Sequence, residues 1–221
     1  KIRNEYPEAD LKILIDKCRQ KLATYATATP YPYPREERIN FCVKYNIPVP
    51  GVIPTMDEAR QLLRGNNLDE QLRVMKLLVQ MGNAPKSIET ELIQLLDKRT
   101  LDDREKLLDI QTLCIQVLGN VATQNAHAIQ YMINSLTTYD DISYAAEPAL
   151  IKIGRPCIAP LISRLDKTTN QDGGLQYRII TILGKIGKDA KPATASIQRV
   201  LKINQNKDVV YAAEAALQVI K

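Results

Sequence analysis

Aromatic side chains are scarce in this chain of 221 residues, which contains ten tyrosines, one phenylalanine and no tryptophan. Its apolar residues are mainly leucine, isoleucine, valine and alanine, and small aliphatic side chains let helices approach one another closely. Hydrophobic residues make up 45% and charged residues 25% of the chain, so extensive disorder is not expected. Aliphatic helix-on-helix packing is therefore the first expectation.

Long apolar runs are also missing. No stretch of the sequence approaches the ~20 apolar residues that a helix needs to span a bilayer, so we expect no membrane span. The opening residues KIRNEYPEADLK lack the apolar centre and the small-residue cleavage site of a signal peptide. Together with the cysteine usage described next, this favours a cytoplasmic location.

Residue types that bind metals or perform catalysis are few. The four cysteines lie far apart in apolar helical patterns, without CxxC spacing, and we expect reduced core residues at Cys18, Cys42, Cys114 and Cys157. His127 is the single histidine, and we interpret it as a surface or helix-capping residue. The sequence therefore supports neither a zinc site nor a catalytic constellation, and we expect a protein that is not an enzyme and uses no cofactor.

Two kinds of polar motif precede helical patterns. The stretch Asp172-Gly173-Gly174 matches neither GxxxxGKS/T nor GxGxxG, so we interpret it as a flexible spacer rather than a phosphate-binding loop. Acidic pairs are expected to cap helix N-termini, where carboxylates accept hydrogen bonds from free N–H groups. These pairs are Asp102-Asp103 and Asp140-Asp141.

Proline and tyrosine alternate in the segment PYPYP at residues 30–34, which follows an amphipathic helical pattern at residues 8–25. Each proline removes a backbone donor and favours extended geometry in the residue before it, so a helix cannot continue here. We interpret the segment as a connecting strap whose tyrosines pack on nearby helices. A ligand for a proline-reading module is the alternative. Residues 1–54 are predicted to form an N-terminal helical cap.

A capping box is present at Thr55, because Glu58 follows it three residues later. It predicts a helix that stops at Gly65, and a shorter helix is expected before it at residues 35–45. No alternation of apolar and polar residues persists anywhere, so we expect no strands of consequence.

From about residue 68 the apolar pattern repeats as pairs of helices. The predicted pairs are 69–81 with 86–97, 104–121 with 125–136, 142–153 with 156–166, and 175–186 with 189–202, followed by a last helix at 208–220. In the helix at 104–121 we expect core positions at Leu108, Leu113, Ile115 and Leu118. The apolar residues before the turns are Met81, Val121, Ile153, Ile186 and Ile220, at intervals of 40, 32, 33 and 34. A period near 33 is typical of stacked two-helix repeats.

Two segments carry a recognisable motif: YAAEPALIKIGRPCIAPLISRLDK at residues 144–167 and RIITILGKIGKDAKPATASIQRVLK at residues 178–202. They resemble the HEAT repeat of the short PBS-lyase-like (EZ-HEAT) kind, which has an Ala-rich first helix, a Leu-Gly-Lys-Ile-Gly turn and a second helix opening with Ala-x-Pro-x-Leu. Residues 183–187 match that turn outright, and the resemblance covers about residues 68–221. It implies an all-α, right-handed α–α superhelix with repeats over residues 55–221.

The chain keeps some family positions and changes another. Gly154 and Gly187 remain at the turns, where we expect the positive φ that glycine tolerates. The family's first helix usually carries an arginine seven residues before the leucine of the turn, and here Ser143, Gln176 and Val210 replace it. In the family this arginine supports a polar ladder between repeats. Whether this chain has such a ladder is left undecided by its sequence.

Positive charge is concentrated in the two segments that carry the motif. Residues 152–202 contain ten Lys or Arg and three Asp, a local excess of seven, whereas residues 1–151 contain 18 basic and 20 acidic residues. If equivalent turns stack, Lys152, Arg155, Lys185, Lys188 and Lys191 form a basic ridge. Arg164, Arg199 and Lys202 lie on second helices, which line the concave face in HEAT proteins. These eight residues are the candidate partner-binding residues.

The resemblance implies a non-catalytic scaffold or adaptor for protein–protein interaction, and the ridge suggests a partner with an acidic surface. A solvated edge without a partner is the simpler interpretation of the same charges. Two alternatives stay open: an accessory subunit of a phycobilin-lyase-like complex, and nucleic-acid binding along the ridge. The nucleic-acid alternative is weaker because aromatic residues scarcely accompany the basic ones.

Overall fold

The computed structural model of the chain describes residues 20, 35–44, 54–82, 84–99, 103–138 and 140–221. Within these ranges the regular structure consists of α-helices and 3-10 helices, and no described residue lies in a strand. The all-α class is therefore confirmed for the described part of the chain. The proline-tyrosine strap, and the first predicted helix apart from Gln20, lie outside it.

The chain divides into two compact units, residues 1–82 and residues 83–221. The first contains α2 (Arg35–Lys44), α3 (Met56–Arg64) and α4 (Leu68–Met81), and both α2 and α3 pack on α4. The domain boundary expected after residue 54 stays a prediction, because the residues just before it lie outside the described ranges.

The capping box that begins α3 is confirmed. The backbone N–H of Glu58 donates to the Thr55 hydroxyl at 3.3 Å, and the backbone N–H of Thr55 donates to the Glu58 carboxylate at 2.7 Å. Reciprocal bonds of this kind satisfy N–H groups that the first helical turn leaves free. The helix ends at Arg64, one residue before the glycine predicted to stop it.

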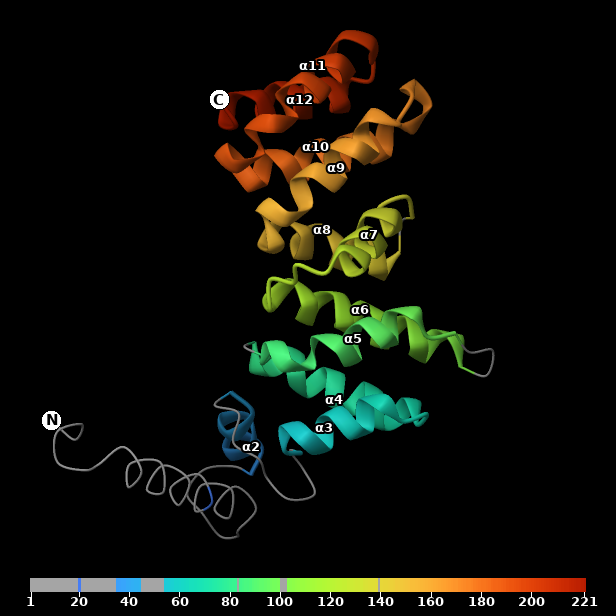
Figure 1. Cartoon of the computed structure of the whole chain (residues 1–221), viewed down its shortest axis with the longest axis vertical. Helices are drawn as coiled ribbons and strands as arrows, with labels where there is room; N and C mark the ends of the chain where they lie inside the picture. Colours follow the sequence, from blue (N-terminus) through green and yellow to red (C-terminus); the bar gives the residue numbers. More distant parts are fainter. Residues whose placement is uncertain (1–19, 21–34, 45–53, 83, 100–102, 139) are drawn as a thin grey trace, which may run out of the picture. The chain divides into compact units, whose positions relative to one another are not determined.

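The second unit consists of paired helices that follow one another in chain order (Figure 1). Its α-helices are α5 (Glu89–Asp97), α6 (Arg104–Asn120), α7 (Ala126–Ser135), α8 (Asp141–Ile153), α9 (Ile158–Asp166), α10 (Gly173–Ile186), α11 (Thr194–Ile203) and α12 (Lys207–Val219). Short 3-10 helices accompany them: η2 (Lys86–Ile88), η3 (Arg155–Cys157), η4 (Asn170–Asp172) and η5 (Gly187–Ala193).

These helices form the two layers of an α-solenoid. The first helices of the repeats, α6, α8, α10 and α12, are neighbours in one layer, and the second helices, α5, α7, α9 and α11, are neighbours in the other. Each second helix also packs on the first helix of the next repeat, as α7 does on α8. Each helix pair therefore buries its apolar face on the neighbouring pairs, as in other repeat proteins.

The predicted turns and caps are present. Gly154 and Gly187 have φ values of 70° and 80°, a region that residues with a Cβ rarely adopt, which explains the glycines after α8 and α10. Asp103 accepts a hydrogen bond from the backbone N–H of Lys106 at 3.0 Å, and Asp140 accepts one from that of Ser143 at 2.9 Å. Both carboxylates therefore cap helix N-termini as expected.

Three sequence-based expectations are wrong in detail. Gly173 and Gly174 are helical rather than a flexible spacer, because the capping box of Thr169 and Asp172 starts helical structure before them. Leu108 is 39% exposed instead of lying in the core, where Ile110 and Cys114 are found. The second helix of the fourth repeat begins with the 3-10 segment η5, whose Pro192 has no N–H for an α-helical hydrogen bond.

Buried glutamines join successive helices at a repeating position. Gln71 donates from Nε2 to the carbonyls of Leu63 and Gly65, both at 2.7 Å, at the end of α3. Gln111 on α6 likewise donates to the carbonyl of Leu96 at the end of α5, at 2.9 Å. Carbonyls at a helix C-terminus lack partners within the helix, so the amides replace lost hydrogen bonds.

Gln176 on α10 occupies the same position, ten residues before the apolar residue that precedes the turn. It donates from Nε2 to the Thr168 hydroxyl and the Thr169 carbonyl just beyond α9, and its own oxygen accepts from Asn204. A polar ladder between successive helices is therefore present at Gln71, Gln111 and Gln176. The equivalent positions on α8 and α12 are Ser143 and Val210, which carry no side-chain amide.

Candidate partner-binding surfaces

Side-chain contacts join consecutive turns of the second unit, where the sequence predicts the basic ridge. Lys152 donates to the side chain of Asn120 at 2.7 Å, linking the end of α8 to the end of α6. Arg155 in η3 forms an ion pair with Asp189 in η5 at 3.3 Å, although both side chains are more than half exposed. The turns after α6, α8 and α10 are therefore adjacent.

Three lysines of the predicted basic ridge lie around the turn after α10. We call Lys185, Lys188 and Lys191 the lysine turn. All three are exposed, and within the described part of the chain their side chains form no hydrogen bond or ion pair. Lys188 and Lys191 lie three residues apart in η5, and side chains at this spacing eclipse one another in a 3-10 helix. The turn therefore holds like charges on one side of a short, ordered segment.

The remaining basic candidates lie on second helices. Arg199 donates to the carbonyl of Leu165 at 2.8 Å and lies 3.6 Å from a carboxylate oxygen of Asp166, so it joins α11 to the end of α9. Arg164 is half-buried, and its Nε atom is buried without a hydrogen-bond partner in the described structure. Lys202 is exposed near the end of α11. Binding of a partner by these three residues stays a prediction.

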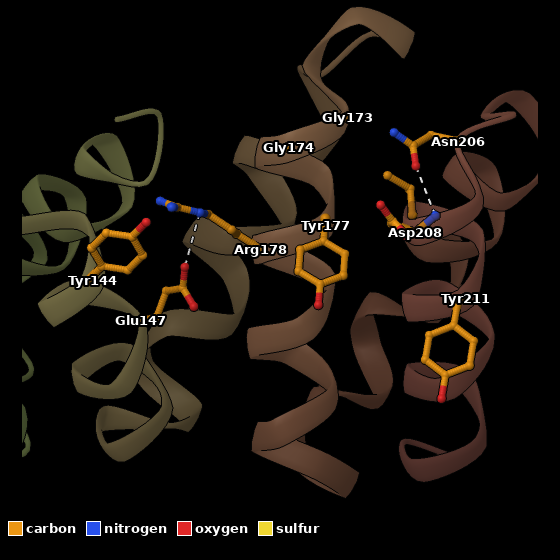
Figure 2. Close-up of a pocket in the computed structure, with 10 residues that line it drawn as sticks. Tyr144, Glu147, Gly173, Gly174, Tyr177, Arg178, Asn206, Asp208 and Tyr211 are labelled. Atoms are coloured by element: carbon orange, nitrogen blue, oxygen red, sulfur yellow. Dashed lines mark hydrogen bonds and ion pairs between the residues drawn. The ribbon is translucent and has the colours of Figure 1, made fainter. Parts of the chain in front are cut away.

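A row of tyrosines on the first helices was not predicted from the sequence. Tyr144, Tyr177 and Tyr211 are 59%, 43% and 74% exposed and come from α8, α10 and α12 (Figure 2). They follow one another at intervals of 33 and 34 residues, so each occupies the same position of its repeat. The signal was therefore available in the segments SYAAEPAL, QYRIITIL and VYAAEAAL.

The three tyrosines line a groove of about 630 Å³ across α8, α10 and the start of α12 (Figure 2). Glu147 and Arg178 lie in it and form an ion pair at 3.2 Å, with side chains 27% and 8% exposed. Gly173 and Gly174 also line the groove, at its upper end in Figure 2. We call this surface the tyrosine groove.

Arg178 is held in place by several contacts at once. Its guanidinium donates to the carbonyls of Leu136 and Thr138 beyond α7, at 3.3 and 2.8 Å, and lies 5.5 Å from the centre of the Tyr144 ring. Ser143 takes the ladder position on α8 and is too short to reach those carbonyls, so Arg178 from the next first helix caps them. The charge is thus paired and hydrogen-bonded, as a buried charge must be.

Reactive side chains in the described residues are few. His127 is exposed on α7 and lies 2.8 Å from an Asp97 oxygen, which agrees with the surface interpretation. Burial raises the pKa of the Cys157 thiol to about 12 and also raises that of Cys114. Cys42 is buried too. These three cysteines are therefore core residues, as predicted, and Cys18 lies outside the described ranges.

The described residues contain no cluster of three or more His, Cys, Asp or Glu side chains arranged to hold a metal ion. Among them, too, no helix has the length and apolar character needed to cross a membrane.

Comparisons with known proteins find distant structural likenesses. No model of a protein family matches the chain, and no curated protein matches its sequence. A crystal structure of an engineered protein is 18% identical, with a TM-score of 0.43 over 93% of this chain and 91% of that one. A designed armadillo repeat protein in complex with the peptide (KR)4 is 14% identical, with a TM-score of 0.45 over 99% of this chain and 96% of that one. At these TM-scores neither likeness bears on function.

Proposed function

We propose that the chain is a non-catalytic scaffold or adaptor of the short HEAT type that binds the acidic surface of a partner protein through the lysine turn. The observation that carries this proposal is the set of three exposed lysines around one ordered turn, without counter-charges of their own. The adjacent Asp189 is already engaged by Arg155, so it does not neutralise them.

The physical argument rests on like charges held close together. Two eclipsed lysines in η5 repel each other, and carboxylates of a partner would relieve that repulsion. Exposed charges of this kind mainly raise the rate of association. Their attraction for a partner weakens with added salt, because dissolved ions screen it over about 10 Å at 0.1 M. A rigid backbone beneath them favours recognition by shape and charge without chemistry.

The proposed repeat type has support of its own in the turns. Glycines of positive φ close α8 and α10, and prolines occur in the first turn of α9 and in η5. A missing N–H in the first turn of a helix costs little, because that group has no partner within the helix. These features agree with the turn and second-helix pattern of the EZ-HEAT unit.

The proposal is tested by reversing the three charges together, in the variant Lys185→Glu, Lys188→Glu, Lys191→Glu. The control reverses three exposed lysines elsewhere, Lys76→Glu, Lys86→Glu and Lys167→Glu, with the same change in net charge. Binding of a fluorescent Glu/Asp-rich peptide, followed by anisotropy at ~0.15 M salt, should weaken at least tenfold in the first variant only. Equal losses in both variants would overturn the proposal.

The alternatives are separated with the same proteins. A labelled DNA duplex that binds tightly at ~0.15 M salt and is lost in the lysine-turn variant, while the acidic peptide does not bind, indicates nucleic-acid recognition instead. A change in absorption when the chain is mixed with a bilin and a phycobiliprotein would support the lyase-like role. Partners retained by the wild type but not by the lysine-turn variant can then be identified by mass spectrometry.

A further inference from the structure

Carboxylates flank two tyrosines of the tyrosine groove at regular positions, in contrast to the lysine turn. Three residues before and three residues after Tyr144 and Tyr211, a carboxylate lies on the same helix face. These carboxylates belong to Asp141, Glu147, Asp208 and Glu214, of which Glu147 and Asp208 line the groove itself. Glu147 is paired with Arg178, whereas the other three are exposed and their side chains form no bond within the described residues. The face is therefore both aromatic and acidic.

The groove already contains one example of the contact that such a face favours. The Arg178 guanidinium lies over the Tyr144 ring and beside the Glu147 carboxylate. A tyrosine face attracts cations because of its quadrupole, and a nearby carboxylate adds to that attraction. The rings of Tyr177 and Tyr211 lie along the same groove (Figure 2), and no cation is placed over either ring by the described residues.

We propose that the tyrosine groove binds an extended segment of a partner protein that carries lysine or arginine at every third residue. Complementarity of charge and the row of rings select this occupant. The proposal goes beyond the scaffold function above, because it concerns a different surface and a partner segment of the opposite charge. It would make the chain an adaptor between an acidic and a basic partner.

The spacing of the repeats sets the spacing of the cations. Packed helices lie about 8–10 Å apart, so successive tyrosines on neighbouring first helices should recur at about that distance. A polyproline II segment rises about 3.1 Å per residue with three residues per turn, which places every third side chain on one face about 9 Å apart. A β-strand alternates faces with each residue, so its third residues would point to opposite sides.

Long-range electrostatic repulsion opposes binding of this partner, so the local chemistry of the groove must decide its affinity. The chain as a whole has a formal net charge of +5, so a cationic peptide is repelled on average. Binding would therefore require the carboxylates and rings of the groove rather than net charge. An exposed tyrosine–cation contact contributes a factor of about two to five in affinity.

The test uses the full chain and two labelled peptides of identical composition. The first contains about four Lys-Pro-Ala units, which keep lysines in register on one face of a polyproline II helix. In the second, the same lysines are contiguous. We expect the first to bind at least about threefold more tightly, with affinity measured by fluorescence anisotropy at ~0.15 M salt.

Substitutions then locate the site. The variant Tyr144→Ala, Tyr177→Ala, Tyr211→Ala should lose at least about tenfold in affinity for the spaced peptide, whereas the corresponding Phe variant should stay within about threefold. The control is Val219→Ala, an exposed apolar residue of α12 outside the groove lining. Far-ultraviolet circular dichroism should be unchanged in all of them, because the tyrosines are exposed.

Several outcomes would overturn the proposal: equal binding of the two peptides, unchanged affinity in the Ala variant, or loss of binding in the Val219→Ala control. Failure here is distinct from failure of the scaffold proposal, because the two use different surfaces and probes. The lysine-turn variant should bind the spaced peptide at least as well as the wild type, and weaker binding there would place the site elsewhere.

Discussion

Neighbouring first helices of the second unit pack in two different ways. At the contacts of α6 with α8 and of α10 with α12, a glycine lies directly against an alanine of the next helix. A Cβ on Gly119 would lie 2.7 Å from the Cα of Ala149, and one on Gly184 would lie 3.1 Å from the Cβ of Ala216. Between α8 and α10 the equivalent glycine is replaced by Ile151, and these two helices make much less contact.

The looser contact, between α8 and α10, contains the ion pair of Arg178 with Glu147 and is lined by the tyrosine groove. Arg178 takes the position that Ala145 and Ala212 occupy in the neighbouring repeats, and it joins Glu147 on α8 to the carbonyls beyond α7. A small residue allows helices to approach closely, whereas an arginine needs room and partners. Buried hydrogen bonds and an ion pair thus hold the contact of α8 with α10, whereas close packing dominates the other two contacts.

The largest expected effect comes from removing Arg178. Arg178→Leu would leave the Leu136 and Thr138 carbonyls and the Glu147 carboxylate without their donor, so we expect a loss of about 3 kcal/mol in the free energy of unfolding. Arg155→Leu is the matched control, because its ion pair is exposed and should contribute no more than about 0.5 kcal/mol. Urea unfolding followed by circular dichroism measures both. Similar losses would contradict the structural role of Arg178.

Close packing is tested by adding one methyl group. Gly119→Ala should lower the free energy of unfolding by about 2 kcal/mol, because its Cβ would meet backbone atoms that cannot move aside. This loss would appear even though alanine favours a helix by about 1 kcal/mol over glycine. Gly173→Ala, whose Cβ would meet neighbours no closer than 3.5 Å, should instead be neutral or stabilising. If both substitutions stabilise the protein, the close approach of α6 and α8 is wrong.

The glutamine ladder should have an intermediate effect. Gln111→Leu would leave carbonyls at the end of α5 without a donor, and we expect a loss of about 1–2 kcal/mol in the free energy of unfolding. Ser143→Ala, at the same position on α8, should cost less than Gln111→Leu because Arg178 caps α7 in its place. Thermal and urea unfolding of the two variants compare them directly, and an equal loss would break the distinction between the two kinds of contact.

The smallest effect concerns the start of α10, which lines the groove. Hydrogen bonds from the backbone and the hydroxyl of Thr169 hold the pKa of Asp172 below its ordinary value of 3.8. A lowered pKa in the folded state means that this carboxylate contributes stability above pH 3.8, which is lost as the pH falls through the folded pKa. Asp172→Ala should therefore unfold at a slightly lower temperature than the wild type at pH 7. A difference that persists at pH 2 would contradict this origin.

Local signals in the sequence anticipated most of the helices. Apolar spacing predicted α6 to α12 to within a few residues, and the cap at Thr55 and the glycine at residue 154 were assigned correctly because each depends on a few adjacent residues. Leu108 was wrongly predicted to be buried, because the spacing of the apolar residues in α6 does not by itself identify the buried face of that helix. The basic ridge was predicted from the sequence as a partner-binding surface, and its partner remains a proposal.

The sequence by itself determined the repeat period, the positions of the helices and their turns, and the segment of the chain that carries the excess of positive charge. Those features depend on residues close together along the chain. Only the tertiary structure decided that Arg178 reaches the end of α7, that glutamines cap the preceding helices, and that three tyrosines from separate repeats line one groove. The Arg178 contacts join residues 40 and 42 positions apart, and the tyrosines lie 33 and 34 positions apart, whereas the glutamines reach back 6 to 16 residues to the preceding helix. The geometry of all these contacts depends on how closely each pair of helices packs.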